Sequence, residues 1–149
     1  MAAGRASGFT TALTDIDTTP QEYLKAIREE FNASYVYVRF SGTLAVAAGD
    51  PVCYVVTDTT FSTVDGTNSV NGAGIAMVAH PIGSVSYGWI QVLGLSGSIT
   101  TLTSGAAGNQ VTNTGAANAA LKIVAAVTDQ VVGSVANVAA RTILLSYPL

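Results

Sequence analysis

Short runs of β-branched and aromatic residues alternate with turn residues along most of the chain, a pattern typical of β-strands. The clearest run is Tyr35–Phe40, and Gly49-Asp50-Pro51 introduces a second run at Val52–Val56. Further runs occur at Ile75–Ala79, Tyr87–Leu93, Ile99–Leu102, Leu121–Val127, Val131–Val138 and Thr142–Ser146. Short strands at spacings of roughly ten residues predict a mostly β protein, folded as a sandwich or a small barrel.

A helical pattern precedes these strands. Thr19 is followed three residues later by Glu22, as in a capping box, and Pro20 stands at the first helical position. Apolar residues then recur at helical spacing, at Tyr23, Leu24, Ile27 and Phe31. The pattern predicts one short amphipathic α-helix over residues 19–32.

The chain divides by character into two parts. Residues 1–18 are rich in Gly, Ala, Ser and Thr, so we expect an N-terminal arm that becomes fixed only against another surface. The arm and the helix make up residues 1–40, and residues 41–149 form the β-rich domain. Within that domain, Asn118–Val127 has mixed propensities and is open to either a strand or a helix.

Charge is scarce, and this narrows the classes of partner. Charged residues make up 10% of the chain, against about 25% in ordinary soluble domains. No Asp, Glu, Lys or Arg occurs from Gly66 through Leu121. Only six Lys and Arg residues and a net charge of −3 argue against binding to nucleic acid. A neutral surface favours contact with other protein surfaces.

Few groups are available for a disulfide, a metal or a cofactor. Cys53 is the only cysteine and His80 the only histidine, so neither an internal disulfide nor an ordinary zinc site is predicted. Gly72 and Gly74 indicate a turn rather than a nucleotide-binding loop. No stretch reaches about 18 uninterrupted apolar residues, so we expect no membrane span. We expect no cofactor and a reducing compartment.

A hydrolytic triad can be drawn from His80, with Ser84 or Ser86 as nucleophile and Asp58 or Asp65 as the acid. A triad needs a nucleophile on a sharp turn beside an oxyanion hole. The nearest approach to the Gly-x-Ser-x-Gly motif, Gly94–Ser98, has the wrong spacing. The sequence therefore indicates a protein that is not an enzyme.

Trp89 lies in the predicted strand Tyr87–Leu93, where it shares one face with Tyr87 and Gln91. We favour a role as a core anchor over a role at an interface. A buried indole needs an acceptor for its N–H, which Gln91 or a backbone carbonyl can provide.

From Gly49 to the end, the chain resembles the capsid decoration, or cement, proteins of tailed bacteriophages. The resemblance rests on the order of several pieces rather than on any one of them. They are Gly49-Asp-Pro-Val52, a Gly/Thr loop, Gly74-Ile-Ala-Met-Val78, Tyr87-Gly-Trp-Ile-Gln-Val-Leu-Gly94, an Ala/Gly-rich middle, Val132-Gly133-Ser-Val and Ile143-Leu-Leu-Ser146. The N-terminal helix and the very low charge depart from the simplest members of this family.

The resemblance implies a β-barrel or β-tulip domain that forms a homotrimer on the outside of the phage head and clamps neighbouring major capsid proteins. It also implies a virion structural protein, made in the host cytoplasm, with an N-terminal segment that reaches across the shell. By position alone, the residues expected to contact the capsid or the trimer are Arg5, Phe9, Tyr23, Ile27, Phe31 and Trp89.

A second interpretation is a β-sandwich module of a phage fibre or tail accessory protein that binds carbohydrate or protein. Exposed aromatic residues would then form the binding platform. The candidates are Tyr35, Tyr37, Tyr87 and Trp89.

Overall fold

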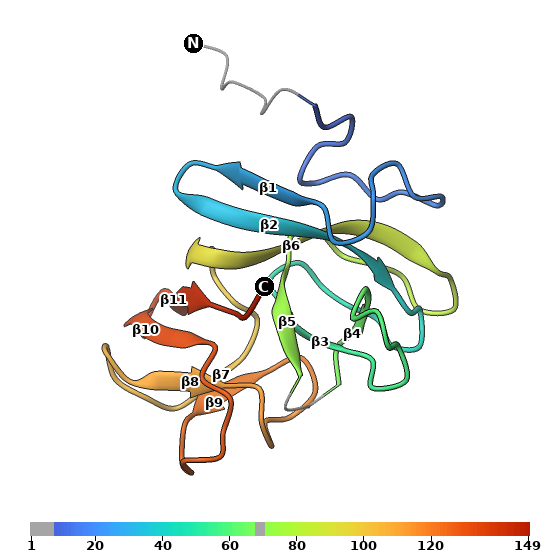
Figure 1. The fold of residues 1–149 in the computed structure, drawn as a ribbon. Helices are drawn as coiled ribbons and strands as arrows, with labels where there is room; N and C mark the ends of the chain where they lie inside the picture. Colours follow the sequence, from blue (N-terminus) through green and yellow to red (C-terminus); the bar gives the residue numbers. More distant parts are fainter. Residues whose placement is uncertain (1–7, 68–70) are drawn as a thin grey trace.

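The computed structural model describes residues 8–67 and 71–149, and all regular structure within them is β (Figure 1). The strands form one sheet in the order β1-β2-β4-β3-β5-β6-β11-β10-β8-β9-β7. Their bounds are β1 Ile27–Glu30, β2 Ala33–Phe40, β3 Pro51–Tyr54, β4 Thr63–Asp65, β5 Gly72–Ala76, β6 Ser86–Leu95, β7 Leu102–Thr103, β8 Gln110–Thr112, β9 Leu121–Ile123, β10 Gly133–Asn137 and β11 Thr142–Ser146. The predicted mostly β class is confirmed.

Five of these strands, β2, β4, β3, β5 and β6, close into a barrel, because β2 pairs with β4 on one side and with β6 on the other. The β2–β6 pairing is antiparallel and runs from Ser34 opposite Leu93 to Phe40 opposite Ser86. The β2–β4 pairing is parallel. Val36, Val38 and Ile90 point into the barrel and are fully buried. Of the two predicted architectures, the structure adopts the barrel.

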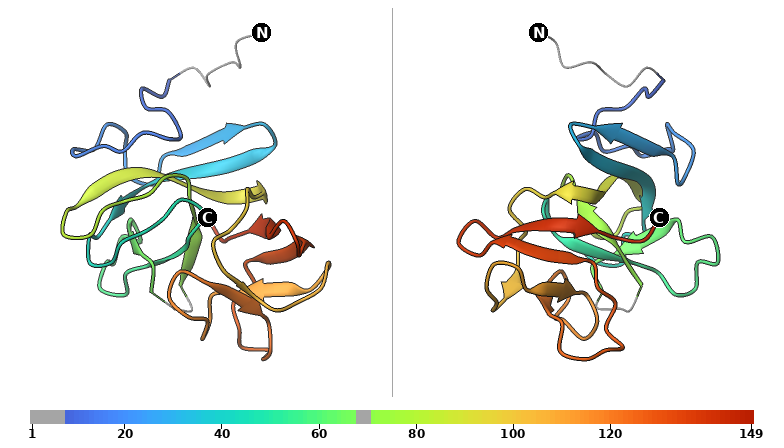
Figure 2. Two further views of the ribbon diagram at one scale, coloured as in Figure 1. Left: turned by 180° about the vertical axis from the view of Figure 1, so that it is seen from behind. Right: turned by 60° about the vertical axis from the view of Figure 1, so that its left-hand side comes forward.

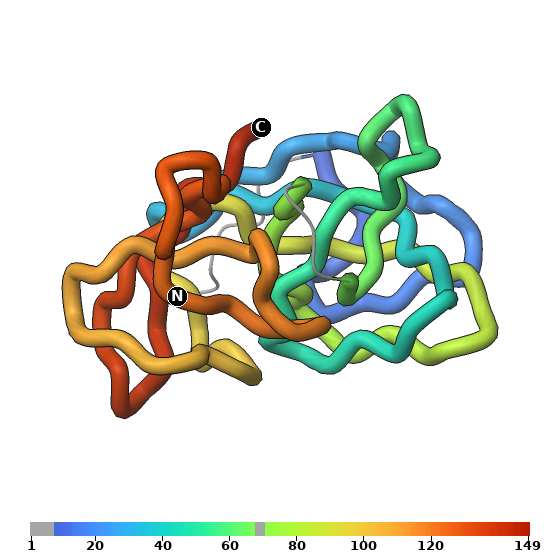
Figure 3. Tube along the Cα trace, turned by 90° about the horizontal axis from the view of Figure 1, so that it is seen from below, coloured from blue at the N-terminus to red at the C-terminus, as the bar shows by residue number. Residues whose placement is uncertain are grey.

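The sheet continues beyond the barrel through the last residues of β6. There, Leu93–Leu95 pair with β11, and β10, β8, β9 and β7 extend the sheet to one side of the barrel (Figure 3). Ile143 and Leu145 from β11, together with Val111 from β8, belong to the same buried cluster as the barrel interior. One hydrophobic core therefore spans both parts.

The predicted helix over residues 19–32 is wrong. Residues 27–30 form β1, which pairs with β2, and Phe31 and Asn32 make the two-residue turn between them with φ of 52° and 62°. Two consecutive positive φ angles are those of a type I′ hairpin turn. The residues predicted to form the apolar face of this helix lie at the surface instead, and Tyr23 among them is 91% exposed.

The hairpin is favoured over the helix because it gives β1 a backbone partner and buries Arg28. Glu22, which the sequence pattern places in a capping box, instead accepts hydrogen bonds from Thr10 and from the backbone N–H of Thr11. Local helical signals were therefore overridden by tertiary contacts.

Residues 8–26, which we call the N-terminal segment, pack on the outside of the barrel (Figure 2). Asp17 forms an antiparallel bridge with Tyr87 of β6, with hydrogen bonds in both directions of 3.0 and 2.8 Å. Phe9 and Leu13 pack on a second buried cluster, formed by Ala33, Tyr35, Tyr37 and Trp89. The described part of the predicted arm is therefore fixed by its own chain.

Other local predictions also changed in three dimensions. Gly72 and Gly74, which the sequence assigns to a turn, both lie within β5. Position 74 requires glycine because a Cβ there would come within 2.7 Å of the Gln91 carbonyl oxygen of the neighbouring strand β6. Leu121–Ile123 is strand β9, so the helical alternative for residues 118–127 is not adopted. The short strands β4 and β8 fall in Thr- and Asn-rich sequence that carries no clear strand pattern.

Candidate functional site

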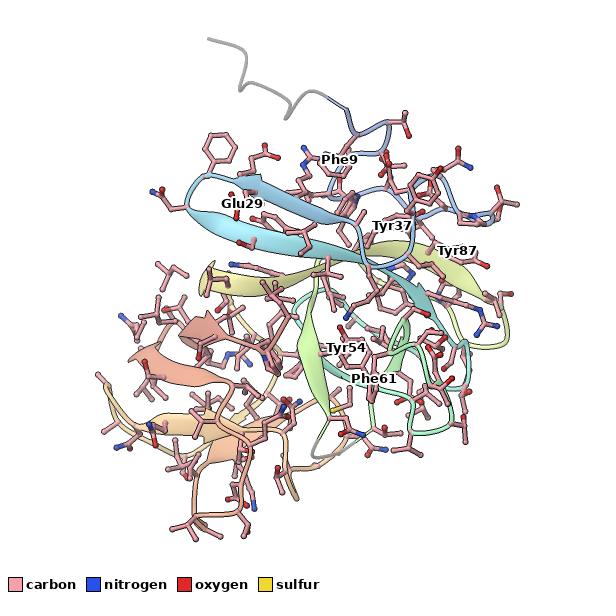
Figure 4. All side chains as sticks on the ribbon, in the orientation of Figure 1. Phe9, Glu29, Tyr37, Tyr54, Phe61 and Tyr87 are labelled. Atoms are coloured by element: carbon pink, nitrogen blue, oxygen red, sulfur yellow. The ribbon has the colours of Figure 1, made fainter. Side chains whose placement is uncertain are left out.

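Trp89 lies in an aromatic cluster between the barrel and the N-terminal segment, together with Phe9 and Tyr37, which are labelled in Figure 4. Its side chain is fully buried, and the rings of Phe9 and Tyr37 each meet it edge to face at 5.2 Å. Its indole N–H donates to the Thr11 hydroxyl at 3.0 Å. The prediction of a core anchor is confirmed, but the acceptor lies 78 residues away in sequence and is neither Gln91 nor a carbonyl.

Arg28 is buried against the same cluster. It pairs with Glu30, donates to the Thr11 carbonyl at 2.9 Å, and lies 5.8 Å from the centre of the Trp89 ring. A buried guanidinium needs such compensation, because desolvation of an unpaired charge costs several kcal/mol, on the order of the stability of a small domain. Arg28 is therefore committed to holding the N-terminal segment and presents no charge for a ligand.

Tyr37 and Asp17 complete the attachment of the N-terminal segment. The phenol of Tyr37 donates to Asp17 and accepts the backbone N–H of Gln21. Burial, and secondly the hydrogen bond to Asp17, raise the pKa of Tyr37 well above its ordinary value. The phenol stays protonated and acts as a structural donor.

The residues predicted to contact a capsid or trimer partner separate into buried and exposed groups. Trp89 is fully buried and offers no surface, whereas Phe9 is partly buried, with its ring packed edge to face on Trp89. Tyr23 and Phe31 are 91% and 74% exposed, and Ile27 is half exposed. Arg5 lies outside the described residues.

His80 and Ser86 do meet, but inside the protein. The His80 Nδ1 lies 2.8 Å from the Ser86 hydroxyl, and the ring stacks on Phe40. Both residues are buried, and the His80 Nε2 has no hydrogen-bond partner within the described structure. Burial lowers the pKa of His80 to about 4, so the ring is neutral near neutral pH.

The two acids that sequence analysis considered with His80 are occupied elsewhere. Asp58 accepts hydrogen bonds from Thr60, Ser62 and Thr63, and these bonds, led by that of the Thr60 hydroxyl, hold its pKa well below the ordinary value. Asp65 accepts from Thr67. In residues 8–67 and 71–149, no carboxylate hydrogen-bonds to His80, so the described contacts form no triad.

The described residues also contain no group of three or more His, Cys, Asp or Glu side chains placed to hold a metal ion. Across the same residues, no helix is long and apolar enough to cross a membrane.

Two surface features remain that the sequence analysis did not identify. The first is an exposed face on β6 and β11 that carries Leu93, Leu95 and Leu144. The second is a pocket where Phe61 meets Tyr54 edge to face at 5.7 Å and the Lys25 ammonium group donates to the Tyr54 hydroxyl at 2.7 Å (Figure 4). Both features depend on strand pairing or on loops that meet only in the folded chain.

Comparison of the chain with models of known protein families, with curated proteins and with solved structures found no match.

Proposed function

We propose that this chain is a virion structural protein, a decoration protein that binds the outside of a tailed-phage head as a trimer and stabilises contacts between major capsid proteins. The observation that carries the proposal is a surface with large apolar side chains at separate places and very little charge. Tyr23 and Leu24 are exposed on the N-terminal segment, and Leu95 and Leu144 are exposed on the second part of the sheet. The more specific part of the proposal, a decoration protein, is supported only by the resemblance in the order of several sequence pieces.

Such a surface suits a protein that acts by contact area. Burying neutral and apolar groups carries a small desolvation penalty compared with burying ions. A stable interface typically buries about 1,600 Å² in total, and several linked contacts raise the effective concentration of each. A trimer on a shell would combine contacts between copies with contacts to capsid proteins.

The N-terminal segment is the proposed shell-binding part, because it is fixed on the barrel and yet leaves Tyr23 91% exposed. The test is co-sedimentation of the purified protein with expanded shells of the major capsid protein from the same virus. We expect saturable binding in a fixed ratio to capsid subunits, and weaker binding for Tyr23→Ser.

The matched control is Val127→Ser, which removes a fully exposed apolar side chain from the connection between β9 and β10. This variant is expected to bind like the wild type. A protein that ignores the shells at every concentration would overturn the proposal.

A second candidate function is carbohydrate binding by a phage fibre or tail accessory protein. Three of the four aromatic residues first considered for this role, Tyr35, Tyr37 and Trp89, are buried. The Phe61 and Tyr54 pocket favours this alternative instead, since a half-exposed ring beside a polar group is a common sugar platform. Saturable glycan binding that is lost in Phe61→Ala would favour this function over shell binding.

A further inference from the structure

The end of β6 presents leucine side chains to the outside. In the pairing of β6 with β11, Leu95 lies opposite Leu144 and Leu93 lies opposite Ser146, so all four side chains point to one side of the sheet. Leu145, which lies between Leu144 and Ser146, points to the other side of the sheet and is buried in the core. Leu93, Leu95 and Leu144 are about half exposed. We call this surface the leucine face.

The β1–β2 turn continues the leucine face on one side. A Cβ at Gly94 would lie 2.6 Å from the Asn32 carbonyl oxygen, which places the turn directly against β6 between Leu93 and Leu95. Leu93 lines a hollow with Phe31 and Glu29, and it also lines a second hollow with Val131 and Leu144. Leu93 therefore borders both hollows, and the β1–β2 turn, the end of β6, β11 and β10 lie along one side of the molecule in Figure 1.

This arrangement reverses the usual pattern of a half-buried antiparallel strand, where polar residues face solvent. Single exposed leucines are ordinary on protein surfaces, but contiguous ones mark interaction sites. Phe31 adds a second anomaly, because a bulky side chain is disfavoured at its φ of 52° and the ring is 74% exposed. Within the described residues of the single chain, no contact covers the exposed leucines or the ring of Phe31.

The charges around the leucine face favour a second copy of the same chain as its occupant. No Lys or Arg lines either hollow, and of the two acids that do, Glu30 is already paired with Arg28. A copy brought against this surface therefore meets little like-charge repulsion. Contacts between identical subunits are also more apolar than contacts between transient partners.

We propose that the leucine face, Leu93, Leu95 and Leu144 with Phe31 and Val131 at its margins, is the contact between copies of this chain. The proposal rests on the proposed function, since it assigns the surface through which the trimer forms. With the leucine face occupied by another copy, the N-terminal segment remains available to bind the capsid shell.

The experiment measures the association of the purified full chain by sedimentation velocity from low micromolar to high micromolar concentration. The wild type is expected to shift from monomer to a larger species. The variant Leu95→Ser/Leu144→Ser is expected to weaken association by about tenfold or more for each leucine removed.

Ile82→Ser is the matched control, because Ile82 has the same composition as leucine and is 63% exposed where Leu95 is 61% exposed. Ile82 precedes β6 while Leu95 ends it, and ten strand residues separate the two ends by about 30 Å. Association of Ile82→Ser is expected to match the wild type. Circular dichroism and urea unfolding verify that each variant is folded.

Should the double variant misfold, hydrogen exchange of the wild type gives the answer without a substitution. Amides around Leu93–Leu95 and Leu144–Ser146 are expected to become more protected as concentration rises, and amides near Ile82 are not. Protection elsewhere alone would overturn the proposal.

The remaining outcomes separate this proposal from the proposed function. A wild type that stays monomeric up to high micromolar concentration overturns the leucine face as a self-contact, whatever the shell assay shows. A double variant that associates normally but no longer binds shells also overturns it, because the face would then dock on the capsid. Normal self-association through the face with no shell binding supports this proposal and contradicts the decoration function.

Discussion

The hydrogen bond between Trp89 and Thr11 offers a direct test of how the N-terminal segment is held. The indole N–H and its acceptor are 3.0 Å apart, and both side chains are buried. Thr11→Val keeps the shape of the side chain but removes the acceptor. A buried donor without a partner costs about 1–3 kcal/mol, so we expect a loss of this size in the free energy of unfolding.

A double-mutant cycle with Trp89→Phe isolates this bond from the packing changes. Phenylalanine has no N–H, so Thr11→Val should cost less in the Trp89→Phe background. The expected coupling is about 1 kcal/mol, which corresponds to roughly 2–4 °C in Tm for a domain of this size.

Urea unfolding followed by far-ultraviolet circular dichroism suits all four proteins, because the signal does not depend on the tryptophan. The midpoint should shift while the slope with denaturant stays constant. Equal costs of Thr11→Val in both backgrounds would refute the hydrogen bond and, with it, the described attachment of residues 8–18.

Three further predictions address the barrel and its interior. Gly74→Ala should destabilise the fold by about 1–3 kcal/mol, because the new Cβ would lie 2.7 Å from the Gln91 carbonyl oxygen. The control Gly97→Ala should be nearly neutral, because no atom lies within 4 Å of a Cβ at that position. Equal urea midpoints for the two variants would contradict the close approach of β5 and β6. Burial lowers the pKa of His80 from 6.5 to about 4 in the folded state. Between these two pH values the unfolded chain binds a proton at His80 and the folded chain does not, so the free energy of unfolding decreases as the pH falls from 6.5 to 4, by about 3 kcal/mol in total. His80→Asn should flatten this dependence in urea titrations at pH 4 to 7, and an unchanged slope would show that His80 is not buried as described. Tyr37→Phe removes the hydroxyl that donates to Asp17 and accepts from the backbone N–H of Gln21. We expect the free energy of unfolding, measured by thermal unfolding, to fall by about 1–3 kcal/mol. An unchanged stability would argue against these two hydrogen bonds.

Sequence patterns determined the class of this fold and most of its central strands. Runs such as Tyr35–Phe40 and Tyr87–Leu93 combine β-branched and aromatic residues, and both lie in barrel strands, β2 and β6. The burial of Trp89 also followed from the sequence, because a large aromatic residue within an alternating run usually faces a core.

Local patterns failed where the outcome depends on a distant partner. The segment at residues 19–32 has helical signals, yet β1 forms because the edge of β2 offers backbone hydrogen bonds and the Trp89 cluster offers burial to Arg28. The strand β4 is only three residues long and is defined by pairing with β2 and β3. Short polar segments carry too little periodicity to predict such pairings.

The candidate binding surfaces divide in the same way. The sequence by itself determined that the chain is poor in charge and rich in short strands, and it placed Tyr23 and Phe31 among the candidate contacts. Only the tertiary structure decided that Leu95 and Leu144 lie side by side and exposed, because their neighbourhood results from the register between β6 and β11. Their register is set by pairing across 49 residues of chain, and no local pattern shows that these two leucines are neighbours.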